Sequence, residues 1–436
     1  MLGWRRNLRG WVMGWLVAAM IGQATIALPQ DAAGTAPPDG IRQLASKHLT
    51  LLTDLPSSPE VDALPDLFDQ AFGQWCDYFG VDADQHVDWH VRTHLMKSRE
   101  RFQAAGLLPA DLPDFFSGYA RADRIWLRDQ TSAYYRRHLL LHEATHSFML
   151  SLCGGMGPPW YAEGVAELLS THRLEDGKLS LNYFPRHRDE VPKLGRIEIV
   201  QTGYAAHRAL SLARLLASDN RAQQANQWYG WCWAAAAFLD GHPRYQARFR
   251  QLHKQVGDID DRFNQHVMET FADDWARLND DWQLFVANLD YGYDFRKMDV
   301  EFTVGEPLGD AGQTISIAAD RSWQSSGVRL EAGHSYRLRA AGRYQVAAEP
   351  RAWLCEPGGV TIRYYRAQPL GILLSAVRAD EASAQSPSGL LKPIVVGLGT
   401  TLDIQQAGTL YLRINDSAGS LGDNAGSLSV EITRDE

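Results

Sequence analysis

The chain has 436 residues, of which 45% are hydrophobic and 22% charged, and its formal net charge is -9. This length exceeds one ordinary core and predicts roughly two to three folded domains, and the composition excludes a largely disordered protein. The acidic balance argues against nucleic acid or an anionic membrane as the main partner.

The first 27 residues are typical of a secretory signal peptide. Three arginines precede an apolar run over 11–22, and residues 25–27 (Thr-Ile-Ala) offer a cleavage site. The alternative is an uncleaved anchor, because the 18 residues from 11 to 28 approach the shortest bilayer-spanning length. Only in that case do we expect membrane contact. Either way, the sequence predicts an exported protein, whether periplasmic, extracellular or at the cell surface.

The residue composition and hydrophobic pattern of the rest of the chain change twice. Residues 28–40 are rich in Pro, Ala and Gly and predict a flexible linker. Residues 41–297 carry Leu, Ala, Arg and Trp at helical spacing, which predicts a mainly α (α+β) domain. Residues 298–436 show short alternating stretches between Gly-, Asp- and Asn-rich turns, which are typical of an all-β sandwich. The expected fold class is therefore multidomain.

Four cysteines are spread over both expected domains. Export makes disulfides possible, but four cysteines allow three pairings, and the sequence does not choose among them. Free buried thiols and one disulfide within the first domain both remain open. The four are Cys76, Cys153, Cys232 and Cys355.

The segment 136–149 has the pattern of a helix. Thr131 or Ser132 can cap its start, and Gly154-Gly155 can end it. Side chains four positions apart on a helix share one face. The sequence therefore predicts that histidines four apart within this segment meet on one face.

Those histidines are His142 and His146, and together with Glu143 they form an H-E-x-x-H motif. The two imidazoles can hold one metal ion, and the carboxylate between them can take a proton from a metal-bound water. The motif alone is also compatible with two solvated histidines on an ordinary amphipathic helix. A further ligand is needed to decide between these readings.

The segment 158–167 follows a Gly-rich turn and predicts a second helix that folds back against the first. Glu163 near its start can supply the third metal ligand and leave the fourth tetrahedral position for water. Glu167 lies four residues further, on the same helix face. It can accept a hydrogen bond from the outward nitrogen of a ligand histidine.

At these residues the sequence resembles the gluzincin metallopeptidases, which include thermolysin and the zinc aminopeptidases. The pattern W-x-x-E-G-x-A-E, from Trp160 to Glu167, is similar to the glutamate helix of the aminopeptidases. The resemblance covers residues 130–175 and implies zinc, a water activated by Glu143, and hydrolysis of a peptide bond. It also implies that Glu167 orients a ligand histidine. The Gly-rich stretch by which aminopeptidases bind a free amine is not evident.

Gluzincins place a Tyr or His further along the chain to stabilise the transition state. Tyr229, before an Ala-rich helix, is our candidate, and Tyr204 and His207 are its rivals; a core aromatic role is the alternative for each. His172 and His187 are interpreted as surface or loop histidines.

A second cluster of oxygen donors lies near the C-terminus, in a turn between two alternating stretches. Asp416, Ser420, Asp423 and Asn424 are the hard ligands that calcium prefers. The alternative is that these residue types simply make the turn. Both readings remain open.

This turn resembles that of the calcium-dependent galactophilic lectins of the PA-IL type. The stretches 323–328, 340–342 and 355–359 are similar to other parts of the same lectin, so the resemblance covers about 315–433. It implies a sandwich with a calcium ion held by the four residues named above. The lectin's sugar-selecting His and Gln loop has no counterpart between Gly359 and Gly371, so a glycan and a protein both remain possible partners.

Two functions follow from these observations. The first is an exported zinc metallopeptidase that acts on peptides or proteins and carries an accessory carbohydrate- or protein-binding sandwich. The second is a binding protein on an inactive peptidase-like scaffold. The first requires a cleft beside His142 that admits a peptide.

Overall fold

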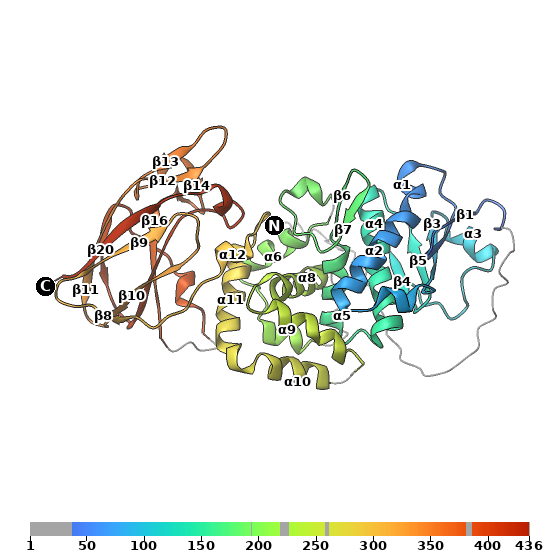
Figure 1. Ribbon diagram of the computed structural model, residues 1–436, viewed down its shortest axis with the longest axis horizontal. Helices are drawn as coiled ribbons and strands as arrows, with labels where there is room; N and C mark the ends of the chain where they lie inside the picture. The colour runs from blue at the N-terminus through green and yellow to red at the C-terminus, as the bar shows by residue number, and fades with distance from the viewer. Residues whose placement is uncertain (1–36, 193, 219–225, 258–260, 381–385, 436) are drawn as a thin grey trace, which may run out of the picture.

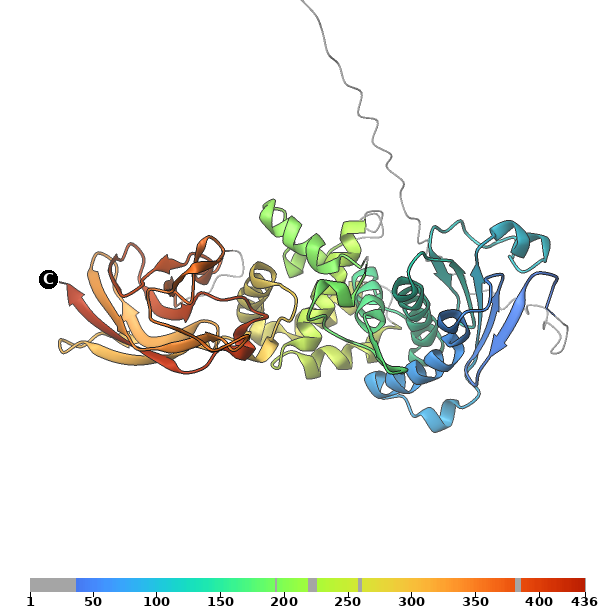
Figure 2. The same ribbon diagram turned by 90° about the horizontal axis from the view of Figure 1, so that it is seen from above.

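The computed structural model describes residues 37–192, 194–218, 226–257, 261–380 and 386–435. The expected signal peptide at 1–27 lies outside these ranges. Among the described residues, no helix combines the length and the hydropathy needed to cross a lipid bilayer. The molecule is a row of three parts: a small sheet with helices, a group of helices, and a β-rich end (Figures 1 and 2).

A five-stranded mixed sheet opens the first domain, in the order β1-β2-β3-β5-β4. The strand pairs β2–β3 and β3–β5 are parallel, whereas β1–β2 and β4–β5 are antiparallel. The sheet belongs to a part of the chain where the sequence indicated mainly helices. The strands are β1 Arg42–Ala45, β2 Leu49–Thr53, β3 Val91–Met96, β4 Gly118–Ala120 and β5 Arg124–Arg128.

Four helices of 12 to 16 residues build the centre of the first domain. The helix expected around the H-E-x-x-H motif is present, and the Ser132 hydroxyl caps it by accepting from the Tyr135 amide at 3.0 Å. Its C-terminal end passes through a π-turn to Gly154, which has a left-handed backbone. The helices are α2 Leu64–Phe79, α4 Ala133–Phe148, α5 Pro159–Ser170 and α8 Asn226–Gly241.

Further elements complete the first domain around this centre. A small hairpin, β6–β7, follows α5, and helices from α6 onward lead toward the β-rich end (Figure 1). Their bounds are α1 Pro59–Asp62, α3 Arg99–Ala104, β6 Arg173–Glu175, β7 Lys178–Ser180, α6 Arg196–Ala205, α7 Leu212–Leu216, α9 Gln246–Gln251, α10 Asp261–Thr270, α11 Trp275–Asn288 and α12 Phe295–Met298.

Two sheets form the β-rich end, in the orders β17-β16-β19-β10-β8 and β18-β11-β20-β9, with hairpins β12–β13 and β14–β15 beside them. Their core draws on both sheets, for example Leu338, Leu412 and Val430. The strands are β8 Glu306–Pro307, β9 Gln313–Ala318, β10 Gln324–Leu330, β11 Ser335–Ala341, β12 Tyr344–Ala347, β13 Trp353–Cys355, β14 Val360–Tyr365, β15 Gln368–Leu370, β16 Leu373–Arg378, β17 Ile394–Val395, β18 Gly399–Asp403, β19 Gly408–Ile414 and β20 Ser427–Asp435.

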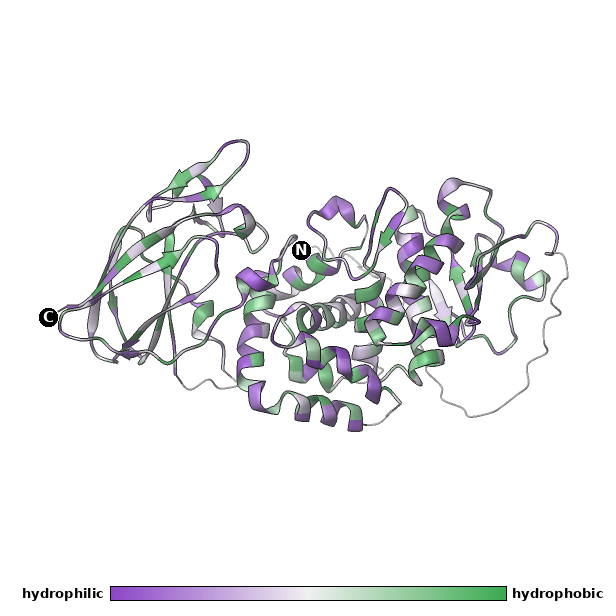
Figure 3. Ribbon diagram, viewed as in Figure 1, coloured by the Kyte–Doolittle hydropathy of each residue, from purple (hydrophilic) through white to green (hydrophobic). Residues whose placement is uncertain are grey.

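Burial follows the expected alternation along several strands of the β-rich end, but not along β19. Buried and exposed residues alternate along β11 and most of β20, and hydrophobic and hydrophilic segments alternate accordingly in Figure 3. All seven residues of β19 are buried. Its second face packs toward the helices, because Tyr411 shares a cluster with Leu284 of α11 and Val300.

The loop after β19 enters the first domain. Ala418 and Leu421 belong to the same hydrophobic cluster as the central helices. Asp294 donates its amide to the Ala418 carbonyl at 3.3 Å. An ideal Cβ at Gly419 would lie 2.0 Å from the Tyr291 carbonyl oxygen, so only glycine allows this approach.

The four cysteines, all within the described ranges, carry free thiols. Burial raises the pKa of Cys76 to about 11 and that of Cys153 to about 12. Thiols this far from ionisation are weak nucleophiles. The sequence left free thiols and one disulfide open, and the structure shows free thiols.

Candidate metal centre

Helices α4 and α5 lie side by side and turn three donor atoms toward one point. His142 Nε2 lies 3.2 Å from His146 Nε2 and 3.2 Å from Glu163 Oε2. His146 Nε2 lies 3.6 Å from the same Glu163 oxygen. The helical spacing of four residues produces the histidine pair, and the Gly-rich turn before α5 brings in the carboxylate.

The spacing of these three atoms fits a tetrahedral metal ion. Zinc–ligand bonds of about 2.0–2.1 Å at tetrahedral angles separate the ligand atoms by about 3.3–3.4 Å. Glu163 Oε2 is buried and has no hydrogen-bond partner among the described residues. A cation between the three atoms would give this buried oxygen a partner. The residues present therefore fit a zinc ion held by His142, His146 and Glu163.

The charges around these ligands also favour a cation. Burial disfavours a charged His142, but the neighbouring carboxylates of Glu163 and Glu167 outweigh this and raise its pKa to about 9. Burial likewise opposes ionisation of Glu163, but the two histidines lower its pKa to about 2. A site that stabilises positive charge without a metal has the electrostatics that a divalent ion requires.

Glu143 lies beside the ligands and is 8% exposed. Burial raises its pKa, which favours a carboxyl that exchanges a proton rather than one that stays ionised. An ideal Cβ at Gly118, on edge strand β4, would lie 2.5 Å from Glu143 Oε1. The absence of a side chain at Gly118 therefore makes the space that Glu143 occupies, and no motif in the sequence identified this glycine.

Replacing Gly118 with alanine tests this space. We expect Gly118→Ala to displace the Glu143 carboxylate and to lower any hydrolytic rate by about 100-fold, since an error of about 1 Å in a reacting group costs that much. The three atoms nearest to this Cβ all belong to Glu143 and none to a metal ligand, so zinc content should stay unchanged by elemental analysis. Gly73→Ala in α2 is the control, because no atom beyond its chain neighbours and its own helix backbone lies within 4 Å of its Cβ. Equal rates in wild type and Gly118→Ala would contradict the placement.

Glu167 carries more contacts than the sequence suggested. Its Oε1 lies 3.5 Å from His142 Nδ1, the position expected of a residue that orients a ligand histidine. Its Oε2 lies 3.4 Å from Nε2 of buried His138, one helical turn before His142. Arg196 donates to both oxygens, at 2.8 and 2.6 Å. The sequence interpretation missed His138 and Arg196; the repeat of histidines every four residues was the available signal for the first.

His138, His142 and Glu167 form a second close group of possible metal ligands. Both Glu167 oxygens, however, already accept hydrogen bonds from the Arg196 guanidinium. A second divalent ion would have to share that carboxylate with a fixed positive charge. The contacts therefore favour one metal ion, between His142, His146 and Glu163.

Tyr229 of α8 lies near the metal ligands, with its ring centroid 6.4 Å from that of His142. Burial, followed by the charge of Glu163, raises the pKa of its hydroxyl, which keeps the group a hydrogen-bond donor. The rivals Tyr204 and His207 are exposed, at the end of α6 and just beyond it. The structure thus brings Tyr229 to the centre.

The two other histidines have different surroundings. His187 is exposed, as expected. His172 lies in the loop between α5 and β6 but not at the surface, because it is 1% exposed and stacks on Tyr134 with ring centroids 4.5 Å apart. Arg137 donates to its Nε2 at 3.1 Å. His172 therefore has a structural role beside α4.

The predicted calcium ligands lie in one loop, but their side chains contact different partners. Asn424 Nδ2 donates to Asp416 Oδ2 at 3.1 Å, and both side chains are buried. Asp423 is exposed, and its Oδ2 accepts from the Ala348 amide at 3.3 Å. Ser420 is half-buried in the turn before it. The first contact lies within the loop and the second joins the loop to the β12–β13 hairpin, and a calcium site remains a prediction.

No protein-family model and no curated protein matches the chain. Among solved structures, it is similar to an aminopeptidase N family protein from Idiomarina loihiensis (13% identity, 90% of this chain, 68% of that chain, TM-score 0.35). It is also similar to the IMPa metallopeptidase from Pseudomonas aeruginosa (14%, 81% and 38%, TM-score 0.18) and to the EclA N-terminal domain, a PllA-like lectin (24%, 28% and 95%, TM-score 0.21).

These structural neighbours are metallopeptidases and a lectin domain, but all three similarities are weak. The chain spans 38% of the length of the IMPa metallopeptidase. Because these TM-scores are low, we interpret the site from its own geometry. The observed architecture is a mixed α/β multidomain fold with a β-rich C-terminal region and a buried His/Glu cluster that could bind a metal.

Proposed function

We propose that the chain is an exported zinc metallopeptidase of the gluzincin type that hydrolyses peptide bonds. One observation carries the proposal: His142 Nε2, His146 Nε2 and Glu163 Oε2 converge within 3.6 Å of one another, and the buried carboxylate of Glu143 interacts electrostatically with all three residues. Three protein ligands with an open fourth position and an adjacent base are the components of a hydrolytic zinc site.

The chemistry follows from the residues that surround the site. Bound zinc would supply a Lewis acid that polarises a carbonyl and brings the pKa of a coordinated water to about 7. Glu143 accepts a proton from the attacking water and returns it to the leaving amine. Tyr229 donates a hydrogen bond to the oxyanion that develops on the carbonyl. Glu167 holds the His142 ring in its orientation.

Metal content is the first test of this proposal. We expect elemental analysis of the purified full chain to find about one zinc per molecule, and Glu163→Ala to lose most of it, because two imidazoles alone hold zinc weakly. Peptides with and without O-linked glycans would then be screened for cleavage. Absence of zinc from wild type, even after it is supplied and the excess removed, would refute the proposal.

A second candidate is a binding protein on an inactive peptidase-like scaffold. The observation that favours it is the burial of the centre, since His142, Glu143, His146 and Glu163 are all at most 8% exposed. A peptide needs an open cleft to reach Glu143. Zinc binding at about one per chain together with no cleavage across a broad peptide library would support this candidate over the peptidase.

The β-rich domain is proposed to be an accessory binding module for a glycan or a protein. Support comes from the PA-IL-like turn, and calcium at Asp416, Ser420, Asp423 and Asn424 is part of the same proposal. The loop between β19 and β20 contacts the first domain, so a partner would have to bind a different edge or compete with that contact.

A further inference from the structure

Arg196 begins α6, outside the two helices that carry the metal ligands, yet its guanidinium reaches Glu167. Nε donates to Glu167 Oε2 at 2.8 Å, and Nη2 donates to Oε1 at 2.6 Å. The two side chains are 15% and 2% exposed. A two-point ion pair between a planar guanidinium and a carboxylate fixes the rotation of the carboxylate as well as its position.

The rotation of Glu167 matters because each of its oxygens also faces an imidazole. Oε1 lies 3.5 Å from His142 Nδ1, and Oε2 lies 3.4 Å from His138 Nε2. His142 presents its other nitrogen to the metal centre. We propose that Arg196 is a positioning residue of the zinc centre, which orients His142 by holding Glu167 at two points. The inference rests on the proposed function, in that it presumes that His142 binds zinc.

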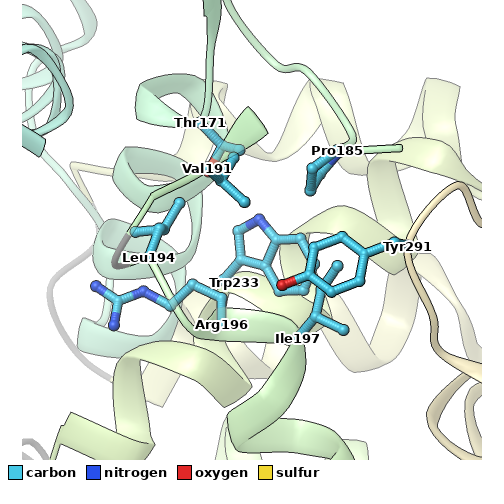
Figure 4. Close-up of a pocket in the computed structure, with 8 residues that line it drawn as sticks. All are labelled: Thr171, Pro185, Val191, Leu194, Arg196, Ile197, Trp233 and Tyr291. Carbon is cyan, nitrogen blue, oxygen red and sulfur yellow. The ribbon is translucent and has the colours of Figure 1, made fainter. Parts of the chain in front are cut away.

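The surroundings of Arg196 give it a rigid base. Its neighbour Ile197 is buried and lines a small cavity under the loop before α6, where the Arg196 side chain is directed away from Trp233 and Tyr291 (Figure 4). Glu198, two residues on, accepts from the Tyr291 hydroxyl at 2.7 Å. These contacts hold the backbone on either side of Arg196 in place, and a positioning residue requires such a fixed base.

The guanidinium also lies 5.7 Å from the centre of the Tyr229 ring. One side chain thus contacts the carboxylate behind a metal ligand and the aromatic residue that faces the same ligand. The simpler alternative is that Arg196 only neutralises the buried charge of Glu167. Arg196→Lys separates the two roles, since lysine keeps the charge but lacks the fork that fixes the carboxylate.

The test compares zinc dissociation constants, measured by competition with a chromophoric chelator, for the full chain and its variants. We expect Arg196→Met to bind zinc about 10- to 100-fold more weakly, the usual effect of losing such a supporting partner. Arg196→Lys should show an intermediate loss and an altered visible spectrum of the cobalt-substituted protein. Arg188→Met is the matched control, because Arg188 pairs with Glu198 in the same region, is 81% exposed and does not touch Glu167.

A double variant decides whether Arg196 acts through Glu167. Arg196→Met should cost no further zinc affinity in a Glu167→Gln background, and that double variant leaves no unpaired buried charge, so it remains informative if Arg196→Met alone fails to fold. Wild-type affinity and spectrum in Arg196→Lys, or equal losses in both backgrounds, would overturn the positioning role alone. A wild type that binds no zinc would overturn the proposed function and this role with it.

Discussion

Glu143→Gln should abolish measurable hydrolysis while zinc stays bound at about one per chain. Glutamine keeps the shape of the side chain in the space opposite Gly118, but it cannot accept and return a proton. General acid–base catalysis contributes about 10²- to 10⁴-fold, and we expect a loss of that size in kcat. Peptide turnover and elemental analysis on the same preparation give both numbers.

A matched control separates this loss from a general effect of removing a carboxylate. Glu175 is 62% exposed at the side chain, pairs with Arg173 on the β6–β7 hairpin, and does not belong to the His/Glu cluster. Glu175→Gln should therefore keep wild-type turnover. Glu143→Gln that also retains wild-type turnover would remove Glu143 from the mechanism and leave the hydrolytic assignment without its base.

Arg378→Met should destabilise the protein by about 3–5 kcal/mol, the usual result of breaking a buried ion pair from one side. Arg378 of β16 donates to Asp280 of α11 through two nitrogens, at 2.9 and 2.8 Å, and both residues are at most 9% exposed. Burial raises the pKa of Asp280, so its charge depends on this partner. The free energy of unfolding in urea measures the effect.

Two further variants make the interpretation unambiguous. Arg329→Met removes a more exposed arginine that contacts Asp380 at 2.7 Å, and it should cost about 1 kcal/mol or less. Adding Asp280→Asn to Arg378→Met removes the unpaired charge and should recover much of the lost stability. If both arginine variants cost the same, the Arg378–Asp280 pair has no special role where the two domains meet.

Local rules explain why the metal helix could be predicted from the sequence. Ser132 has the residue type of a helix cap, and His142 and His146 have the spacing of one helix face, so a short stretch of chain determines both. Tyr336, Leu338 and Ala340 alternate with exposed residues because one face of β11 meets a core.

The five-stranded sheet escaped prediction for an equally physical reason. Its central strands, β2 and β3, are buried on most of their length and do not alternate. Short apolar runs of this kind have no period that separates a buried strand from a buried helix segment. The role of Gly118 was missed for the same reason. It depends on the position of strand β4 beside helix α4, and the sequence did not predict that strand.

Arg196 could not have been found from the sequence by any spacing rule. It lies 29 residues after Glu167, in a different helix, and no motif links the two positions. Only the packing of α6 brings the guanidinium to the carboxylate. Residues that support a metal ligand from a distant element are determined by tertiary structure, whereas the ligands themselves lie on two consecutive helices.

The insertion of Ala418 and Leu421 into the helical core has a consequence for how the molecule can be divided. The change in composition suggests a domain boundary near residue 298, but the hydrophobic core of the helical domain includes residues beyond it. A fragment that ends at residue 298 would therefore lose part of its core. The two halves are therefore expected to melt in a single cooperative transition.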